Sequence, residues 1–110
     1  MHPSARLFTQ LPCRITFFTR SNCSLCINAR QTLSNVWDTR PFFYKEIDVM
    51  TPEGKLWKDL YEFDTPVIHV RSSAKEEESP YLASKAVKLM HRFTEEEVKS
   101  KMDVAENETT

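Results

Sequence analysis

A short apolar segment at residues 14–19 (RITFFT) leads directly into a helical pattern that begins with two cysteines, and this junction strongly constrains the fold. The β-branched and aromatic residues of the segment indicate a buried strand. Over residues 24–37 the apolar side chains recur at steps of three and four, which is typical of an amphipathic helix. Residues 42–49 predict a second strand. Because a helix connects the two strands, we expect them to be parallel.

The remainder of the chain predicts two further strands and two further helices. Residues 51–53 (TPE) form a helix-start signal, with a capping hydroxyl, a proline and an acidic first turn. Residues 67–70 and 86–93 have strand-like patterns, and Thr94 with Glu97 predicts a capping box at the start of a last helix. The predicted order is β-α-β-α-β-β-α. This order indicates an α/β (α+β) fold with a four-stranded mixed sheet flanked by helices.

The length of 110 residues predicts one domain. We expect a flexible lead-in at residues 1–12, the folded domain at residues 13–103 and a disordered tail at residues 104–110. Within the domain, residues 72–85 are polar and charged, and we expect an exposed insertion loop there.

Composition and charge exclude several classes of function. Fifteen Lys and Arg against 16 Asp and Glu leave a net charge of −1, so neither a nucleic acid nor an anionic membrane is an expected partner. No apolar run approaches the ~20 residues of a membrane helix. Gly54 is the only glycine, so the sequence contains neither a dinucleotide-binding fingerprint nor a phosphate-binding loop.

The three cysteines show no structural disulfide framework, which fits a reducing compartment. We therefore expect a cytoplasmic location, and we also expect the protein to be a monomer. The Arg and Ser content of the first residues, without acids, leaves a mitochondrial location as the alternative.

Cys23 and Cys26 lie at the junction of the first strand and the first helix. Helical geometry puts both sulfurs on one face within disulfide distance, so the pair can cycle between dithiol and disulfide. The unpaired N–H groups and the dipole of the helix start favour an ionised sulfur at Cys23, which is the nucleophilic form. We expect Cys26, one turn further in, to be more buried and to resolve a mixed disulfide formed at Cys23.

Other interpretations of these cysteines remain open. The pair could be inert buried thiols, a structural disulfide or half of a zinc site. A single Cys-x-x-Cys motif supplies only two of the four ligands that a structural zinc site needs. The residues near His69 and His91 do not repeat the spacing of zinc ligands, so we expect no metal. Both histidines are expected to be half-buried strand residues. Cys13 is expected to be a small apolar residue of the core. The strand between Cys13 and Cys23 spans ~20 Å, which is too far for a disulfide between them.

Thr65 and Pro66 precede the third predicted strand. A proline there cannot donate to the sheet, and a cis bond would leave the backbone groups of Thr65 free to pair with an extended substrate. The strand–Cys-x-x-Cys–helix opening, the Thr-Pro pair and the element order resemble the glutaredoxin branch of the thioredoxin fold. The chain is most similar to small glutaredoxin-like proteins of fungi and other eukaryotes, from residue 14 to about residue 101.

This resemblance implies a thiol–disulfide oxidoreductase of cellular redox homeostasis and electron transport. Cys23 matches the nucleophilic and Cys26 the resolving cysteine, acting on a disulfide-bearing protein or on a glutathione mixed disulfide. Arg20 matches a family lysine that could stabilise the thiolate and dock a glutathione carboxylate. Thr65 and Pro66 match the cis-proline element that holds the tripeptide backbone. No tightly bound cofactor is implied, and glutathione is a candidate for the reductant.

Two departures from the family pattern concern glutathione. Residues 24–25 (SL) replace the Pro-Tyr between the cysteines, and residues 93–95 (FTE) stand where a Gly-Gly pair receives the γ-glutamyl end. Two alternatives to an oxidoreductase also remain open. One is a non-catalytic binding module that recognises partners through the groove at residues 65–66, with the thiols incidental. Another is an iron–sulfur carrier in which Cys23 and glutathione bridge a dimer, although the missing glycine pair argues against it.

Overall fold

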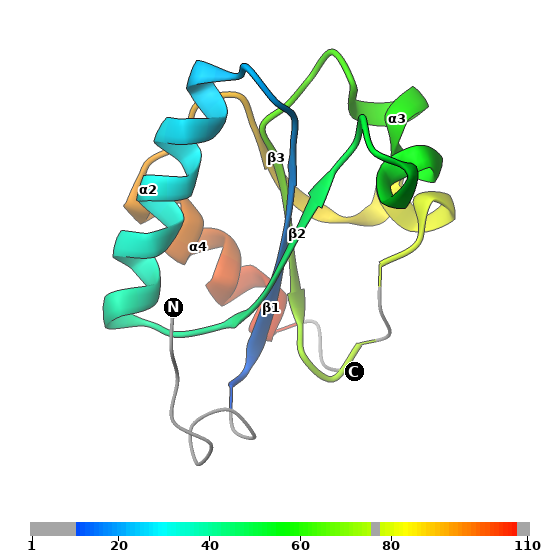
Figure 1. The fold of residues 1–110 in the computed structure, drawn as a ribbon. Coiled ribbons are helices and arrows are strands. Elements are labelled where there is room, and N and C mark those ends of the chain that lie inside the picture. Colours follow the sequence, from blue (N-terminus) through cyan, green and yellow to red (C-terminus); the bar gives the residue numbers. More distant parts are fainter. Residues whose placement is uncertain (1–10, 76–77, 108–110) are drawn as a thin grey trace.

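The computed structural model describes residues 11–75 and 78–107 of the chain. In chain order the elements are β1 (Cys13–Thr19), α2 (Ser24–Thr39), β2 (Phe43–Asp48), η1 (Pro52–Gly54), α3 (Lys55–Tyr61), β3 (Val67–Ser72), η2 (Pro80–Lys85), β4 (Val87–Met90) and α4 (Glu95–Glu106) (Figure 1). The elements labelled η are short 3₁₀ helices. The predicted β-α-β-α-β-β-α order is confirmed.

The strands form one mixed sheet in the order β2-β1-β3-β4. β1 is parallel to β2 and antiparallel to β3, and β3 is antiparallel to β4. Ile15 of β1 lies opposite Tyr44 of β2 and Val70 of β3. The sheet therefore has the mixed, four-stranded arrangement that the sequence predicts.

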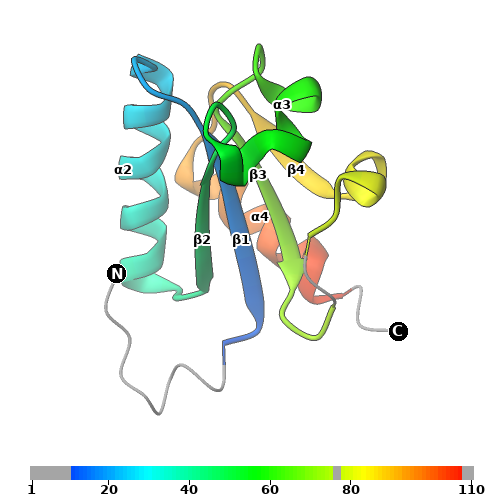
Figure 2. The same ribbon diagram turned by 45° about the vertical axis from the view of Figure 1, so that its right-hand side comes forward.

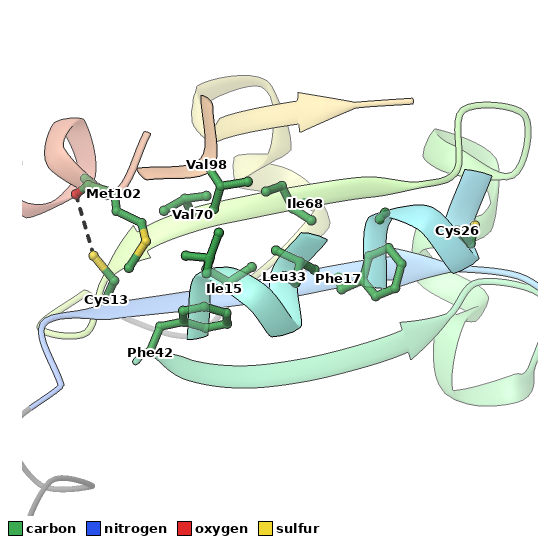
Figure 3. Close-up of a cluster of buried hydrophobic side chains, with 13 residues drawn as sticks. Cys13, Ile15, Phe17, Cys26, Leu33, Phe42, Ile68, Val70, Val98 and Met102 are labelled. Atoms are coloured by element: carbon green, nitrogen blue, oxygen red, sulfur yellow. Dashed lines mark hydrogen bonds between the residues drawn. The ribbon is translucent and has the colours of Figure 1, made fainter. Parts of the chain in front are cut away.

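Helices cover both faces of the sheet (Figure 2). On one face, α2 and α4 pack side by side and contribute Leu33, Val36, Val98 and Met102 to a buried cluster with Ile15 of β1 (Figure 3). On the other face, α3 and η2 cover a second cluster that includes Phe18, Ile47, Val49, Trp57, Tyr61, Val67 and Ala83. Alternate residues of β1 thus serve two separate cores, as the period-two geometry of a strand requires.

The last helix begins as the sequence predicts. Thr94 is the N-cap of α4, where its side chain accepts a hydrogen bond from the backbone of Glu97 and the Glu97 side chain accepts one from the backbone of Thr94. The helix ends later than expected, at Glu106 rather than before residue 104. Ala105 is buried against the α2 side of the core, and this packing extends the helix into the predicted tail.

The predicted insertion loop is also more ordered than its polar composition suggests. Ser72 is a buried residue of β3, residues 80–85 form η2, and Ala83 is buried beneath α3. The side chain of Glu78 is only 7% exposed. The segment therefore covers part of the sheet instead of extending into solvent as a whole.

Most of the predicted lead-in lies outside the described residues, but its last two residues are attached to the domain. The carbonyl of Leu11 accepts a hydrogen bond from the Ser73 hydroxyl over 2.7 Å, and that of Pro12 accepts one from the Ser73 N–H over 2.9 Å. In the part of the chain that the structure describes, none of the helices has the length and apolar character needed to cross a membrane.

Candidate functional site

Cys23 is the N-cap residue of α2, with extended dihedral angles of φ −118° and ψ 102°. Its Sγ accepts a hydrogen bond from the backbone N–H of Cys26 over 3.1 Å. The first turn of α2 contains no acidic residue that would oppose a negative charge there. An ionised Cys23 sulfur is therefore stabilised both by an amide hydrogen bond and by the helix dipole.

The two cysteines are joined by a disulfide, with their Cα atoms 5.2 Å apart. Cys23 is partly exposed, whereas Cys26 is only 2% exposed and belongs to the core on the α2 side of the sheet. The expected difference in burial is thus present. A sulfur atom of another molecule can approach Cys23 from solvent. The buried Cys26 is in contact with Cys23 through the disulfide.

A tight turn carries the chain from β1 into α2. Asn22 takes a left-handed φ of 58°, a conformation that Asn adopts more readily than most other non-glycine residues. Arg20 lies at the start of this turn, and its guanidinium donates to the carbonyl oxygen of Glu62 over 2.7 Å. Because Glu62 is the C-cap of α3, this hydrogen bond ties the turn before Cys23 to the end of α3.

The peptide bond between Thr65 and Pro66 is cis. Pro66 is buried, and its carbonyl oxygen accepts a hydrogen bond from the backbone N–H of His91 over 2.8 Å. Thr65, two residues before β3, remains partly exposed.

The structure brings Arg20, Cys23 and Thr65 together along one open depression. Pro66 follows Thr65 in the chain but does not line this depression. The remaining lining comes from Asn22, Ser24, Leu25, Glu62 and Phe63. Sequence reasoning did not identify the last two, whose only signal is their position just before Thr65. The ring of Phe63 is 86% exposed, so it offers an apolar contact beside Cys23.

A second depression adjoins the disulfide on the β2 side. Thr19 lines it with both cysteines, and its charged lining residues are Arg20, Arg30, Glu46 and Asp48. The Arg30 side chain pairs with Glu46 over 3.0 Å, and this hydrogen bond is the main cause of the raised pKa of Arg30. Sequence reasoning did not single out Thr19. The only signal in the sequence is a hydroxyl residue that directly follows two phenylalanines at the end of the strand segment.

Residues 93–95, which replace the family's glycine pair, lead into α4, whose N-cap is Thr94 and whose first residue is Glu95. Phe93 lines a small depression together with Leu25, His91 and Arg92. This segment therefore adjoins the middle of the Cys-x-x-Cys motif. The depression beside this segment is lined by the side chains of Phe93 and Arg92, where the family pattern has a glycine backbone.

The two histidines differ from the half-buried strand positions expected for them. His69 is fully buried, and its two ring nitrogens lie 2.6 Å from the Tyr61 hydroxyl and 2.9 Å from the Glu78 carboxylate. His91 follows β4, is exposed and has a φ of 65°. Within residues 11–75 and 78–107, no group of three or more His, Cys, Asp or Glu side chains is arranged to hold a metal ion.

Cys13 is the buried filler that its position in the strand predicts. It is free and 0% exposed, and its Sγ lies 3.6 Å from the carbonyl oxygen of Met102. Burial is the main cause that raises the pKa of Cys13 to about 11. Figure 3 shows Cys13 and Cys26 at opposite ends of the same buried cluster, so Cys13 is no disulfide partner for Cys23 or Cys26.

Comparison with known proteins agrees with this geometry. Residues 14–103 match the model of a family described as a glutaredoxin-like domain (DUF836). A thioredoxin from Fasciola hepatica superposes with a TM-score of 0.58 at 12% identity, over 91% of this chain and 88% of that chain. Thioredoxin O2 from Arabidopsis thaliana in its oxidised state gives 0.58 at 11% identity, over 87% and 76%. A structural genomics target protein from X. campestris gives 0.55 at 18% identity, over 83% and 97%. At these identities the likeness establishes the thioredoxin fold.

Proposed function

The chain belongs to the glutaredoxin-like domain family (DUF836), and from this membership we propose that it is a thiol–disulfide oxidoreductase. One observation carries the proposal. The partly exposed Cys23 caps a helix, its sulfur accepts an amide hydrogen bond, and it is bonded to a buried Cys26. This arrangement favours the thiolate at the sulfur that a substrate can reach.

The proposed reaction begins with the dithiol form of the protein. The Cys23 thiolate attacks one sulfur of a substrate disulfide, so that a mixed disulfide forms and the other substrate sulfur leaves as a thiolate. Cys26 then loses its proton to solvent and attacks the Cys23 sulfur. The second substrate sulfur leaves and takes up a proton. Two electrons have passed from the protein to the substrate, and the protein is left with the Cys23–Cys26 disulfide.

We assign substrate-binding roles to Arg20, Thr65 and Pro66. Arg20 supplies a positive charge beside Cys23, which suits both a thiolate and a carboxylate of glutathione. The backbone at Thr65 is proposed to pair with an extended substrate segment, and Pro66 fixes the position of that backbone. The substrate is a disulfide-bearing protein or a glutathione mixed disulfide.

We further propose glutathione as the external reductant that returns the disulfide to the dithiol. The depression at Arg20 and Thr65 is open to such a tripeptide, and Phe63 lies along the same depression. A redox titration in glutathione buffer and in a thioredoxin-based buffer tests this point. Reduction by thioredoxin alone would contradict the role of glutathione while preserving the oxidoreductase activity.

The central experiment measures the reduction of a glutathionylated peptide by the reduced protein. Cys23→Ser is expected to abolish the reaction, because it removes the nucleophile. Cys26→Ser is expected to accumulate a mixed disulfide between Cys23 and the substrate, which mass spectrometry detects. Cys13→Ala serves as the matched control and should retain activity, because Cys13 is buried away from the pair. Full activity of the Cys23→Ser variant would end the proposal.

A further inference from the structure

Thr19 carries a hydroxyl for which the fold supplies no hydrogen-bond partner. The residue is 5% exposed, and its Oγ1 is one of two buried side-chain polar atoms, within residues 11–75 and 78–107, that lack a partner. Burial of an unpaired hydroxyl costs free energy, and nearly all buried polar groups in native proteins are paired. The position of this group therefore needs an explanation.

The location of Thr19 points to the cysteine pair. Thr19 is the last residue of β1, opposite Asp48 in the sheet register, and its backbone carbonyl is already bonded to the N–H of Val49 over 3.0 Å. Phe17, two residues earlier on β1, belongs to the same core cluster as Cys26. Because side chains alternate along a strand, Thr19 projects toward this same face of the sheet, the face that α2 covers. Thr19 and Cys26 also line the same depression.

On the basis of the proposed oxidoreductase function, we propose that the Thr19 hydroxyl is the donor that stabilises the Cys26 thiolate during the resolving step. In the disulfide form the hydroxyl has no hydrogen-bond partner, the Cys26 sulfur included. The contact therefore belongs to the mixed-disulfide form, in which Cys26 Sγ is no longer bonded to Cys23 Sγ. A thiolate is a charged acceptor and makes a much stronger hydrogen bond. The donor already lies along the same depression as Cys26 before the charge on its sulfur forms.

The hydroxyl donates a hydrogen bond but gives up no proton in this step. Starting from the mixed disulfide, the Cys26 thiol releases its proton to solvent, and its Sγ attacks Cys23 Sγ. The Cys23–substrate bond breaks, the substrate sulfur leaves with the bonding pair and then takes up a proton, and the Cys23–Cys26 bond forms. Thr19 is therefore a positioning residue that lowers the cost of the charge on Cys26 before the attack.

Other charged groups also act on this charge. Arg20 and Arg30 lie along the same depression as Cys26, and Glu46 and Asp48 face it from β2. Glu62 lines the neighbouring depression on the other side of Cys23. Substitution of Thr19 leaves all five groups unchanged. A difference between variant and wild type then reports on the hydroxyl itself.

The two chemical steps can be followed separately by mixing the reduced protein with dithiodipyridine, which releases one coloured thione at each step. The first phase reports the attack by Cys23, and the second reports resolution by Cys26. Thr19→Val, which has nearly the same shape, should leave the first phase unchanged. Its second phase should be about tenfold slower at neutral pH, with the pH midpoint raised by about one unit. Thr19→Ser should restore both the rate and the midpoint.

Thr16→Val is the matched control, because Thr16 is also a buried threonine of β1 but lines a cavity with Trp57 and Ile47 on the α3 side of the sheet. It should show wild-type phases. A wild-type second phase in Thr19→Val would overturn the proposal, as would a Thr19→Ser variant that behaves like Thr19→Val. Equal slowing of both phases would assign Thr19 a merely structural role and would also overturn it. Absence of both phases in the wild type would instead refute the oxidoreductase function.

Discussion

The guanidinium of Arg20 donates to the backbone carbonyl of Glu62 over 2.7 Å, although the two residues are 42 positions apart in the chain. Arg20 belongs to the turn that leads to Cys23, and Glu62 ends α3. Both residues line the depression beside the partly exposed Cys23. The hydrogen bond therefore fixes where a positive charge lies relative to the Cys23 sulfur, and it couples that position to α3 on the other face of the sheet.

Replacing Arg20 should change the reactivity of Cys23 through charge. Arg20→Met keeps a side chain of similar length but removes the cation, and it should slow alkylation of Cys23 roughly two- to fivefold at neutral pH. Arg20→Lys keeps the charge and should remain close to the wild-type rate. The measurement is the pH dependence of iodoacetamide alkylation in a reduced Cys26→Ala background. Equal rates in Arg20→Met and wild type would show that Arg20 acts only as a bridge to Glu62.

Tyr61→Phe should destabilise the protein without impairing its thiol chemistry. The Tyr61 hydroxyl lies 2.6 Å from a ring nitrogen of the fully buried His69, and the other nitrogen contacts Glu78. Removal of the hydroxyl leaves a buried nitrogen unpaired, which costs about 1–3 kcal/mol of the free energy of unfolding. Urea denaturation measures this loss. Tyr81→Phe is the control, because Tyr81 is 94% exposed and its substitution should change the stability little.

An unchanged unfolding midpoint in Tyr61→Phe would contradict this role for the Tyr61–His69–Glu78 hydrogen bonds. Dithiol kinetics in the same variant separate stability from function. Tyr61 packs in the cluster on the α3 side of the sheet, whereas Cys26 packs in the cluster on the α2 side. We therefore expect the rates of the dithiol reaction to stay as in wild type.

Features that depend on neighbours in the chain could be predicted from the sequence. The Cys23–Cys26 pair at the helix start and the capping box of Thr94 and Glu97 are local patterns, in which the interacting residues are three positions apart. Strand and helix signals alternate along the chain, and a helix connects the first two strands. These two features were enough to predict that the first two strands are parallel.

Contacts between distant segments could not be predicted in the same way. Glu78 lies in a polar, charged segment, and only the folded chain shows that its carboxylate reaches the buried His69. The end of α4 was misplaced because the burial of Ala105 depends on packing against other elements and not on its neighbours in sequence. The unpaired hydroxyl of Thr19 is likewise visible only once α2 covers the end of β1.

Cys13 should make the stability of the oxidised protein sensitive to alkaline pH. Burial, followed by the charge of Glu106, raises the pKa of Cys13 from its ordinary value of 9.0 to about 11. Well below pH 9 the thiol is protonated in both the folded and unfolded states, so it adds no pH dependence there. As the pH rises from 9 toward 11, the unfolded state loses this proton first, and the free energy of unfolding falls.

The test compares the pH dependence of urea unfolding in wild type and Cys13→Ala across this range. Lysines and tyrosines titrate in both proteins, so the difference between their slopes isolates the thiol. We expect the steeper loss of stability in wild type. Parallel slopes would mean that Cys13 ionises as easily in the folded state as in the unfolded state. The absolute stability of Cys13→Ala is a separate quantity, because the smaller side chain leaves a cavity.

Gly54→Ala should be among the more damaging single-methyl changes in this chain. Gly54 ends η1 and is buried, and its φ of −91° is one that any residue can adopt. The constraint is space, since an added Cβ would lie 2.5 Å from the Cα of Val49 and would also clash with the carbonyl oxygen of Asp48. Both obstacles are backbone atoms at the end of β2, so the turn between β2 and α3 must shift.

The expected cost of Gly54→Ala is about 1–3 kcal/mol of the free energy of unfolding. Glu53→Ala, at the exposed neighbouring position, provides the control, and equal urea midpoints for the two variants would show that this turn yields without strain.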